Sequence, residues 1–196
     1  MIPLTPANEN KHSVKDKILL TAHDLFYSSG FKATGIDKII KQAKVTKVTF
    51  YRYFPSKSDL ILAYLHYRHE IWTHWFRGAL SSNVHEGKSP VEALTGALND
   101  WFNSPLFRGC AFINATADAE SEEVAKEIKH ICREHKTETG NIIAAQLTLT
   151  DSTLTQHIVM LMDGAIIHAQ MGMETNAVLD FFQTGLERLF PANHSV

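Results

Sequence analysis

The sequence predicts an all-α protein with about nine helices. Apolar residues recur at a helical spacing from residue 14 to residue 190, and helix start and stop signals divide the chain at regular points. We find no segment with the apolar–polar alternation of a strand. The 196 residues are 44% hydrophobic and 20% charged, which is typical of a globular protein with a buried core.

The first helix is expected over residues 14–29. Ser13 and Asp16 form a start signal of the capping-box type, in which each side chain bonds to the backbone amide of the other residue. Apolar residues then follow a period of 3.6 as far as Phe26, and Gly30 is a typical residue just beyond a helix end.

Two short helices are expected next, over residues 35–42 and 46–53. Thr34 and Thr46 are candidate N-caps for them, because a threonine hydroxyl can accept a hydrogen bond from a free amide of the first turn. Pro55 is expected to stop the second helix, since proline lacks an amide hydrogen and clashes with the preceding turn.

A longer helix is expected over residues 56–80. Ser56 and Asp59 provide its start signal, and the polar segment Ser81-Ser82-Asn83 is expected to end it. Periodicity predicts five further helices, over residues 90–103, 109–119, 121–148, 152–171 and 175–190.

Charge is distributed unevenly along the chain. Residues 1–60 hold 10 Lys and Arg against 5 Asp and Glu, whereas residues 61–196 hold 9 against 16, so that the overall formal charge is only −2. A basic N-terminal part on an acidic remainder predicts that the first part meets a polyanion such as nucleic acid. A solvated lysine-rich surface would explain the charge alone equally well.

From the sequence we expect a cytoplasmic protein without a membrane contact. The N-terminus lacks the basic and apolar regions of a signal peptide, and no run approaches the roughly 18 apolar residues that a membrane span needs. Cys110 and Cys132 are too few for a disulfide framework, and free thiols fit a reducing compartment.

The two short helices and the turn Ala43-Lys44-Val45 between them have the layout of a helix-turn-helix, whose second helix enters the major groove of DNA. Val45, Phe50 and Phe54 are expected to pack inward. The residues left to face outward carry hydroxyls and cations, which suit phosphates and base edges: Thr46, Lys47, Thr49, Tyr51, Arg52 and Tyr53. Tyrosines taken singly are more often packing residues, but this combination favours nucleic-acid binding.

Residues 14–60 resemble the DNA-binding domain of TetR-type transcriptional regulators, most densely in the run Thr-Phe-Tyr-Arg-Tyr-Phe-Pro-Ser-Lys from Thr49 to Lys57. The resemblance implies a two-fold dimer that binds a double-stranded DNA operator as a repressor and is released by a small ligand. It also implies a flexible N-terminal arm over residues 1–12, a helix-turn-helix domain over residues 13–56, and a ligand-binding and dimerisation domain over residues 57–196.

The same resemblance implies DNA contacts. Thr34, Tyr51, Tyr53 and Lys57 correspond to phosphate contacts, Lys47, Val48 and Thr49 face base edges, and Thr46 belongs to the same DNA-binding set. Two positions depart from the family pattern. Lys44 replaces a glycine common in the turn, so a left-handed conformation there would cost about 1 kcal/mol. Val48 replaces a usually small residue, so an operator cannot be borrowed from a relative.

The remaining two-thirds is rich in aromatic residues at helical spacing. Such residues are more often core than pocket, but the family resemblance implies an effector held between these helices, so that we expect an apolar or aromatic ligand. The candidate ligand-binding residues are Tyr67, Trp72, Trp75, Trp101, Phe102 and Phe112.

The last two helices are the expected dimer interface, because they carry more apolar surface than a terminal hairpin can bury by itself. The candidate dimerisation residues are Leu154, Ile158, Leu161, Ala165, Phe181, Phe182, Gly185 and Leu189. On this basis Gly185→Arg should place an unpaired charge in the interface and yield a monomer or an aggregate. Packing against the protein's own core is the alternative.

Two other residue groups have alternative interpretations. Cys110 follows Arg108 at a predicted helix N-terminus, which suits a thiol sensor of oxidants or electrophiles, although a small buried core residue is the commoner case. His66, Glu70 and His74 share a helix face, but no second helix supplies further ligands, so we expect no metal and no cofactor.

We therefore expect a DNA-binding regulator and not an enzyme. The sequence has no GxSxG, P-loop, HExxH or Rossmann glycine pattern. The alternatives are a thiol-based redox-sensing repressor, a small-molecule enzyme of the helical domain, and an adaptor that binds only protein; the basic excess disfavours the adaptor.

Overall fold

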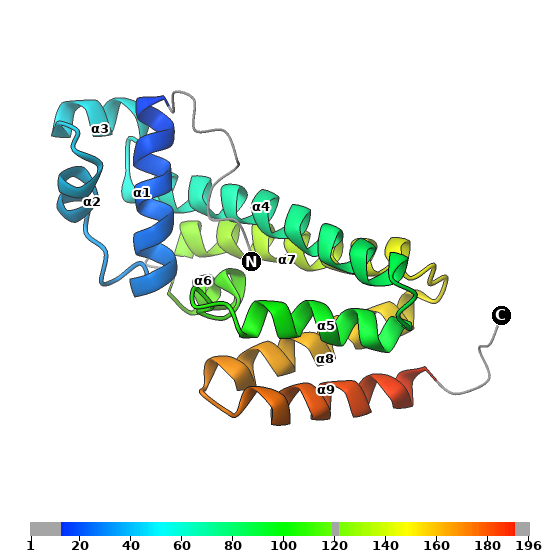
Figure 1. Cartoon of the computed structure of the whole chain (residues 1–196). Coiled ribbons are helices and arrows are strands. Elements are labelled where there is room, and N and C mark those ends of the chain that lie inside the picture. Colours follow the sequence, from blue (N-terminus) through cyan, green and yellow to red (C-terminus); the bar gives the residue numbers. More distant parts are fainter. Residues whose placement is uncertain (1–12, 119–121, 191–196) are drawn as a thin grey trace. The chain divides into compact units, whose positions relative to one another are not determined.

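The computed structural model describes residues 13–118 and 122–190, which form nine α-helices and no strand (Figure 1). They are α1 (Val14–Ser29), α2 (Ile36–Ala43), α3 (Lys47–Tyr53), α4 (Lys57–His85), α5 (Pro90–Phe102), α6 (Ala111–Asp118), α7 (Glu122–Gln146), α8 (Ser152–Gln170) and α9 (Thr175–Leu189). The predicted all-α class is confirmed. The arm expected over residues 1–12 lies outside the described residues. None of the described helices has the length and hydropathy to cross a membrane.

Local capping starts α1 and α3 as expected, but the cap expected at Thr34 is wrong, because Gly35 is the N-cap of α2 and no side chain caps this helix. The hydroxyl of Ser13 accepts the amide of Asp16, whose carboxylate accepts the amide of Ser13 at 3.0 Å, so α1 begins with the predicted capping box. The Oγ1 of Thr46 accepts the amide of Thr49 at 3.1 Å at the start of α3.

Two predicted boundaries are wrong. The helix expected to end at Leu80 continues to His85, because Asn83 is buried and its Nδ2 donates to the carbonyl of Ala93 at 3.0 Å. A tertiary contact thus satisfies a side chain whose type favours a break. The helix expected from residue 109 begins at Ala111, because Gly109 has a φ of +81°.

The described residues divide into two compact units. The first, here called the N-terminal unit, contains residues 13–71, 111–118 and 122–135; the C-terminal unit contains residues 72–110 and 136–190. The start of α4 thus belongs to the same compact unit as the helix-turn-helix. The functional division at residue 56 concerns DNA and ligand binding, and it stays a prediction.

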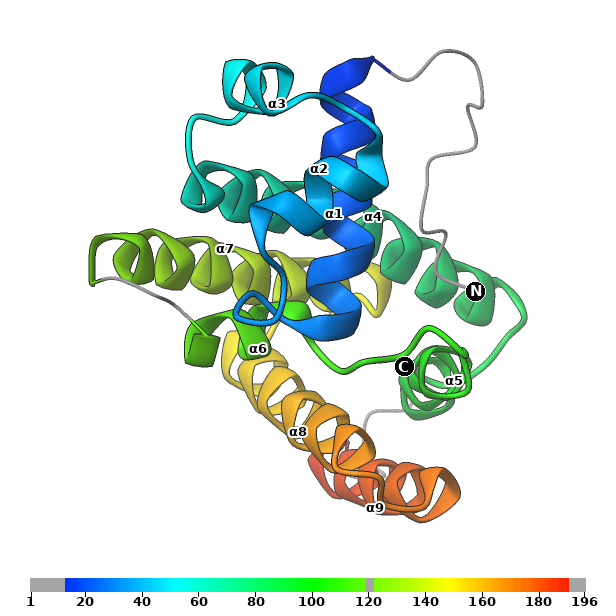
Figure 2. The same ribbon diagram turned by 90° about the vertical axis from the view of Figure 1, so that its left-hand side faces the viewer.

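An aromatic core holds α1 and its neighbours in the N-terminal unit. Phe26, Phe31 and Tyr64 are buried and meet edge to face, with ring centroids 5.2 to 5.9 Å apart. Phe50 of α3 is fully buried, and α2 packs on both α1 and α3 (Figure 2). These contacts position α3 on the unit by its inward face alone.

In the C-terminal unit, α9 packs on α8 and on α5. Leu98 of α5, Met162 of α8 and Leu186 of α9 are buried in its core. Burial of such side chains contributes about 1.5 to 3 kcal/mol each relative to exposure. The core residues of α8 and α9 therefore hold this helix pair to its unit. The opposite face of the pair is not needed for that packing.

Candidate functional site

The turn of the helix-turn-helix is closed by a left-handed lysine. Lys44 has φ 54° and ψ 46°, and its amide donates to the carbonyls of Ile40 and Lys41. The amide of Val45 then donates to Ile40 at 3.2 Å. The left-handed conformation expected at Lys44 is confirmed. It costs a lysine about 1 kcal/mol relative to a glycine at the same position.

Helix α3 has the expected inward and outward faces. Phe50 and Phe54 are buried, whereas Val45 is only half-buried. The outward residues Thr46, Lys47, Val48, Tyr51, Arg52 and Tyr53 are exposed, and Thr49 is half-buried. Val48 projects furthest, with 73% of its surface exposed. The predicted reading residues thus share an exposed face that a groove of DNA could cover.

Two polar contacts shape this exposed face. The hydroxyls of Thr46 and Thr49 lie 2.8 Å apart, which orients both at the N-terminus of α3. The Nζ of Lys47 lies 3.9 Å from Asp37, and both side chains are largely exposed. Such an exposed pair contributes little to stability, so Lys47 is available for another anionic or acceptor group.

One predicted DNA contact is wrong. The side chain of Thr34 has 0% exposure, and its hydroxyl donates to the carbonyl of Leu25 at 3.3 Å. A side chain without exposed surface cannot reach a phosphate, so Thr34 acts as a structural bridge between α1 and the segment before α2. Lys57, by contrast, lies half-buried at the first position of α4.

The six predicted ligand-binding residues divide between the two units, four in the C-terminal unit and two in the N-terminal unit. Trp72, Trp75, Trp101 and Phe102 pack with Phe76 and Phe107 in the C-terminal unit; Trp72 stacks on Phe76 at 4.7 Å and meets Trp101 at 5.6 Å. These rings fill the space between themselves, as core residues do.

The other two candidates belong to the N-terminal unit. Phe112 stacks on His135 with ring centroids 3.6 Å apart, and the ring of Tyr67 lies 5.4 Å from that of His23. A role of these six residues in effector binding stays a prediction.

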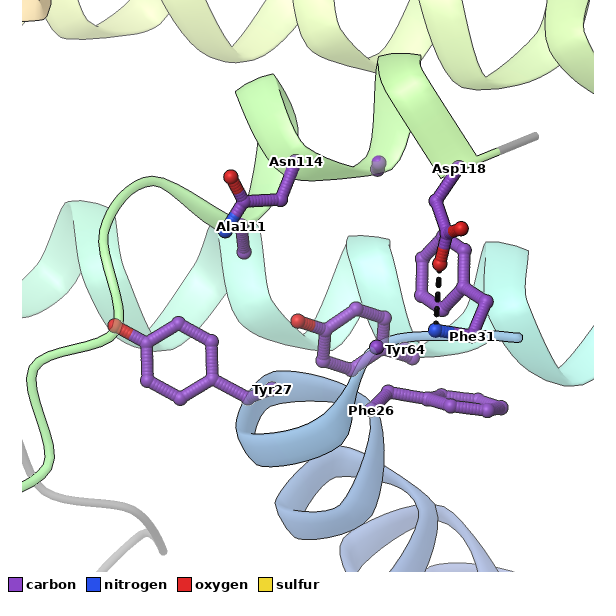
Figure 3. A pocket seen from close by; sticks show the side chains of 9 residues that line it. Phe26, Tyr27, Phe31, Tyr64, Ala111, Asn114 and Asp118 are labelled. Carbon is purple, nitrogen blue, oxygen red and sulfur yellow. Dashed lines mark hydrogen bonds between the residues drawn. The ribbon is translucent and has the colours of Figure 1, made fainter. Parts of the chain in front are cut away.

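A small cavity lies between α1, α4 and α6 within the N-terminal unit, with a volume of about 30 Å³. Phe26 and Tyr27 of α1 and Tyr64 of α4 line one side, and Asn114 of α6 lies across from them (Figure 3). This cavity is not predictable from the sequence, because its lining comes from three helices far apart in the chain.

The carboxylate of Asp118 ties α6 to the loop after α1. Its Oδ2 accepts the amides of Phe31 at 2.7 Å and Lys32 at 3.3 Å (Figure 3). The Nζ of Lys32 lies 3.4 Å from the other carboxylate oxygen. An acidic residue at a helix C-terminus is unfavourable to the helix dipole, and that sequence signal could have indicated a partner elsewhere.

We predict that Asp118→Ala lowers the free energy of unfolding by about 1 to 2 kcal/mol, because two amides lose a charged acceptor. Hydrogen–deuterium exchange should accelerate at the amides of Phe31 and Lys32. Asp151→Ala is the matched control, since Asp151 also accepts two amides, at the start of α8. Unchanged exchange at Phe31 in the Asp118 variant would contradict the role.

Cys110 contacts a half-buried ion pair in the C-terminal unit. The Nζ of Lys136 lies 3.7 Å from its sulfur and also bonds to the carboxylate of Asp163. Burial alone would lower the pKa of Lys136, but the neighbouring sulfur and carboxylate together raise it. Cys110 is buried. The predicted neighbour Arg108 instead donates to the carbonyls of Pro105 and Phe107.

An apolar groove runs along α8 and α9. Its volume is about 360 Å³, and it is lined by Met160, Leu161, Gly164, Ala165, His168, Met173, Val178, Phe181 and Phe182. Met160 and Phe181 are 70% and 69% exposed. Large apolar side chains gathered in a groove are typical of a surface that another molecule covers.

The predicted dimerisation residues differ in burial. Ile158, Ala165 and Phe182 are buried within the chain, and of these Ala165 and Phe182 also line the groove. A Cβ on Gly185 would lie 2.8 Å from Leu161, so this glycine serves close packing of α9 on α8. Leu154, Leu161 and Leu189 are half-buried, and Met160 is an exposed groove residue that the sequence analysis missed.

The comparisons with known proteins agree with this geometry. The family model for bacterial regulatory proteins of the tetR family matches residues 18–64. A solved TetR-family transcriptional regulator from Streptomyces coelicolor is 30% identical, with a TM-score of 0.69, and the match covers 90% of this chain and 93% of that one. This chain belongs to the TetR family of transcriptional regulators. The family resemblance of residues 14–60 is thereby confirmed.

Other TetR-family likenesses are weaker in sequence. The reduced form of Escherichia coli NemR has a TM-score of 0.74 at 19% identity, covers 91% of this chain and 98% of its own, and supports the fold alone. An uncharacterised HTH-type regulator from Lactococcus lactis is 28% identical over 125 residues, 62% of this chain and 64% of that relative. This chain thus spans less than two thirds of the length of this relative and of the two matched regulators YuxN and YxaF from Bacillus subtilis.

Proposed function

We propose that this TetR-family protein is a homodimeric transcriptional repressor that a small-molecule effector releases from a DNA operator. The observation that carries the proposal is the form of α3, which Phe50 anchors by one face while cations and hydroxyls stay exposed on the other. The solved relative CifR, in a cysteine-mutant form, is described in complex with a 26-base-pair operator DNA, which supports double-stranded DNA as the partner.

On this proposal, residues of α3 divide into reading and positioning roles. Lys47 reaches a guanine edge and Val48 a thymine methyl, because an ammonium and an apolar branch suit those groups. Thr46 and Thr49 lie at the helix N-terminus, and Tyr51, Tyr53 and Lys57 bind phosphates. Two copies of α3 would enter successive major grooves of a near-palindromic operator.

The groove along α8 and α9 is the proposed homodimer surface. A two-fold interface needs a surface that is complementary to itself. Met160 and Phe181 line the groove and are exposed, so that their side chains in one copy can insert into the groove of the other. The packing of α8 on α9 makes the pair a ready half of a four-helix bundle.

The effector is proposed to bind in the helical part of the chain and to lower DNA affinity. Its apolar or aromatic character rests on the family resemblance and on the aromatic content of residues 57–196. Coupling between effector and operator is commonly worth about 1 to 3 kcal/mol, and the fluorescence of Trp72 or Trp101 would report binding.

The direct test is to select genomic DNA fragments with the purified protein and to footprint the fragments that it retains. We expect a protected region with two-fold symmetry and an affinity at least about a thousandfold above that for random DNA at the same salt concentration, which is the lower end of the usual range of specificity ratios. Equal retention of random fragments would reject sequence-specific repression.

A second candidate is a repressor that responds to oxidants or electrophiles through Cys110. The ammonium of Lys136 beside the sulfur favours it, since a neighbouring cation is a feature of reactive thiols. The relative NemR is described in a reduced form, which adds support. Addition to an α,β-unsaturated carbonyl would join the sulfur to the β-carbon while Lys136 gives a proton to the α-carbon, and the proton lost from the thiol would restore the Lys136 ammonium.

We predict for this candidate that peroxide or an unsaturated carbonyl releases the wild type from DNA, and that Cys110→Ser resists release by tenfold or more in reagent concentration. Gel shifts over a reagent series measure the effect. Cys132→Ser is the matched control, since the Cys132 sulfur is also buried and contacts the carbonyl of Phe112. Release of Cys110→Ser at wild-type concentrations would leave ligand-gated repression as the function.

A further inference from the structure

Arg68 is a buried cation that the proposed DNA contacts do not use. It lies on α4 one helical turn after Tyr64, and only 2% of its surface is exposed. Its Nη1 has no hydrogen-bond partner among the described residues. The ion pairs found among those residues do not include Arg68 either. The guanidinium therefore lacks the counter-charge that a buried arginine ordinarily has.

The immediate neighbours of Arg68 are aromatic. The guanidinium carbon lies 4.0 Å from the centre of the Tyr27 ring, a cation–π contact that offsets part of the lost hydration. Nearby His23 has 0% exposure; its Nδ1 lies 3.0 Å from Asp24, and its Nε2 has no partner among the described residues. Burial, opposed by Asp24 and reinforced by Arg68, lowers the pKa of His23.

Asp24 and Glu70 act together with Arg68 on the neighbouring Tyr67, but no ion pair among the described residues neutralises Arg68. A lowered pKa leaves His23 neutral at pH 7, and the carboxylate of Asp24, 59% exposed, is directed to the His23 ring. Arginine keeps its charge at all physiological pH values, and its planar fork matches a carboxylate with two parallel hydrogen bonds. The buried guanidinium of Arg68, whose Nη1 has no hydrogen-bond partner among the described residues, is therefore suited to bind an anionic ligand.

The small cavity between α1, α4 and α6 lies next to this group. Tyr27 and Tyr64 line the cavity (Figure 3). The Tyr27 ring also contacts the guanidinium of Arg68, which lies one turn after Tyr64 on α4. Its volume of about 30 Å³ can hold about two waters or the two oxygens of a carboxylate, but not a whole aromatic molecule. Tyr27 is only half-buried, so its ring is the movable part of the wall.

We propose that Arg68 binds the carboxylate of an acidic small molecule, which enters through this cavity when the Tyr27 ring turns aside. The inference deepens the proposed function, on which it rests, by giving the effector a charged head in addition to an apolar body. An anion that draws the guanidinium off Tyr27 would change the packing of α1, whose C-terminal end leads into the loop held by Asp118.

The test measures anion binding directly, without DNA. The full-length protein is titrated with sodium benzoate, sodium hexanoate, neutral benzamide, sodium phosphate and sodium chloride at constant ionic strength, and binding is followed by calorimetry and thermal unfolding. We expect the two carboxylates to bind and raise the Tm, and benzamide, phosphate and chloride to have no effect. Arg68→Met should weaken benzoate binding at least tenfold.

The stability of the ligand-free variant is a second readout. Replacing an uncompensated buried charge by an apolar side chain of similar length is often neutral or stabilising, so Arg68→Met should melt at or above the wild-type Tm. Arg77→Met is the matched control, because Arg77 lies on the same helix and forms an exposed ion pair with Glu138 at 2.9 Å. It should keep wild-type benzoate affinity.

Several results would overturn the inference. They are equal binding of benzamide and benzoate, a response to phosphate or chloride as large as that to carboxylates, no response of the wild type to either carboxylate, or wild-type benzoate affinity in Arg68→Met. If the methionine variant does not fold, Arg68→Lys keeps the charge without the fork, and unchanged benzoate affinity in it would equally reject the site.

The outcome separates this inference from the proposed function. An operator that is bound and then released by a neutral effector, with no carboxylate binding, would reject the anion site and leave repression intact. Carboxylate binding that depends on Arg68, in a protein that selects no DNA, would do the reverse.

Discussion

Phe181→Asp is expected to convert the proposed dimer into a monomer and to lower operator affinity by about a hundredfold to ten-thousandfold. Phe181 is 69% exposed and lines the groove between α8 and α9. A carboxylate there would be buried without a partner when two copies associate, which strongly opposes association. A monomer then binds one half-site and loses the gain in affinity that comes from linking two sites.

Light scattering and fluorescence anisotropy on an operator fragment measure the two effects. Val84→Asp is the matched control, since Val84 is an exposed apolar residue of α4 in the same unit and does not line the groove. Phe181 is a sharper choice than Gly185, because a side chain at Gly185 would first collide with Leu161 of its own chain. A Phe181→Asp protein that stays dimeric would place the interface elsewhere.

Lys47→Ala should lower the affinity for the cognate operator by about 1 to 3 kcal/mol and have a smaller effect on DNA whose contacted guanine is replaced. Lys47 is exposed on α3, and its long contact with Asp37 at 3.9 Å leaves its ammonium available. The loss of that exposed pair should change the Tm very little.

Lys57→Ala provides the comparison, because a phosphate contact has no sequence information. It should weaken all DNA alike and reduce the slope of log affinity against log salt by about 1 per subunit. Titrations at several salt concentrations, on cognate and random DNA, distinguish the two roles. If Lys47→Ala weakens cognate and random DNA by the same factor, Lys47 is a phosphate anchor and the reading face of α3 lies elsewhere.

The features that the sequence predicted correctly depend on short stretches of chain. The Ser13 and Asp16 capping box, the left-handed Lys44 and the inward Phe50 each follow from residue type and from neighbours within a few positions. Local hydrogen bonds and helical periodicity act over the same distance along the chain. For this reason the helices and the helix-turn-helix could be read without a structure.

The features that could not be predicted from the sequence depend on contacts between distant segments of the chain. Asn83 extends α4 only because the Ala93 carbonyl accepts its amide, and Thr34 is buried only because α1 lies beside it. Residue type alone favours a helix break at Asn83 and a phosphate contact at Thr34. In both, a tertiary hydrogen bond decided the outcome.

The sequence alone thus determined the fold class, the family and the residues that could face DNA, since these depend on local propensity and on a dense motif. Only the tertiary structure decided which apolar residues of α8 and α9 are core and which are surface, and it alone brought Arg68 to Tyr27 and Lys136 to Cys110. Periodicity identifies the apolar face of a helix, but burial and charge balance depend on what other elements pack against it.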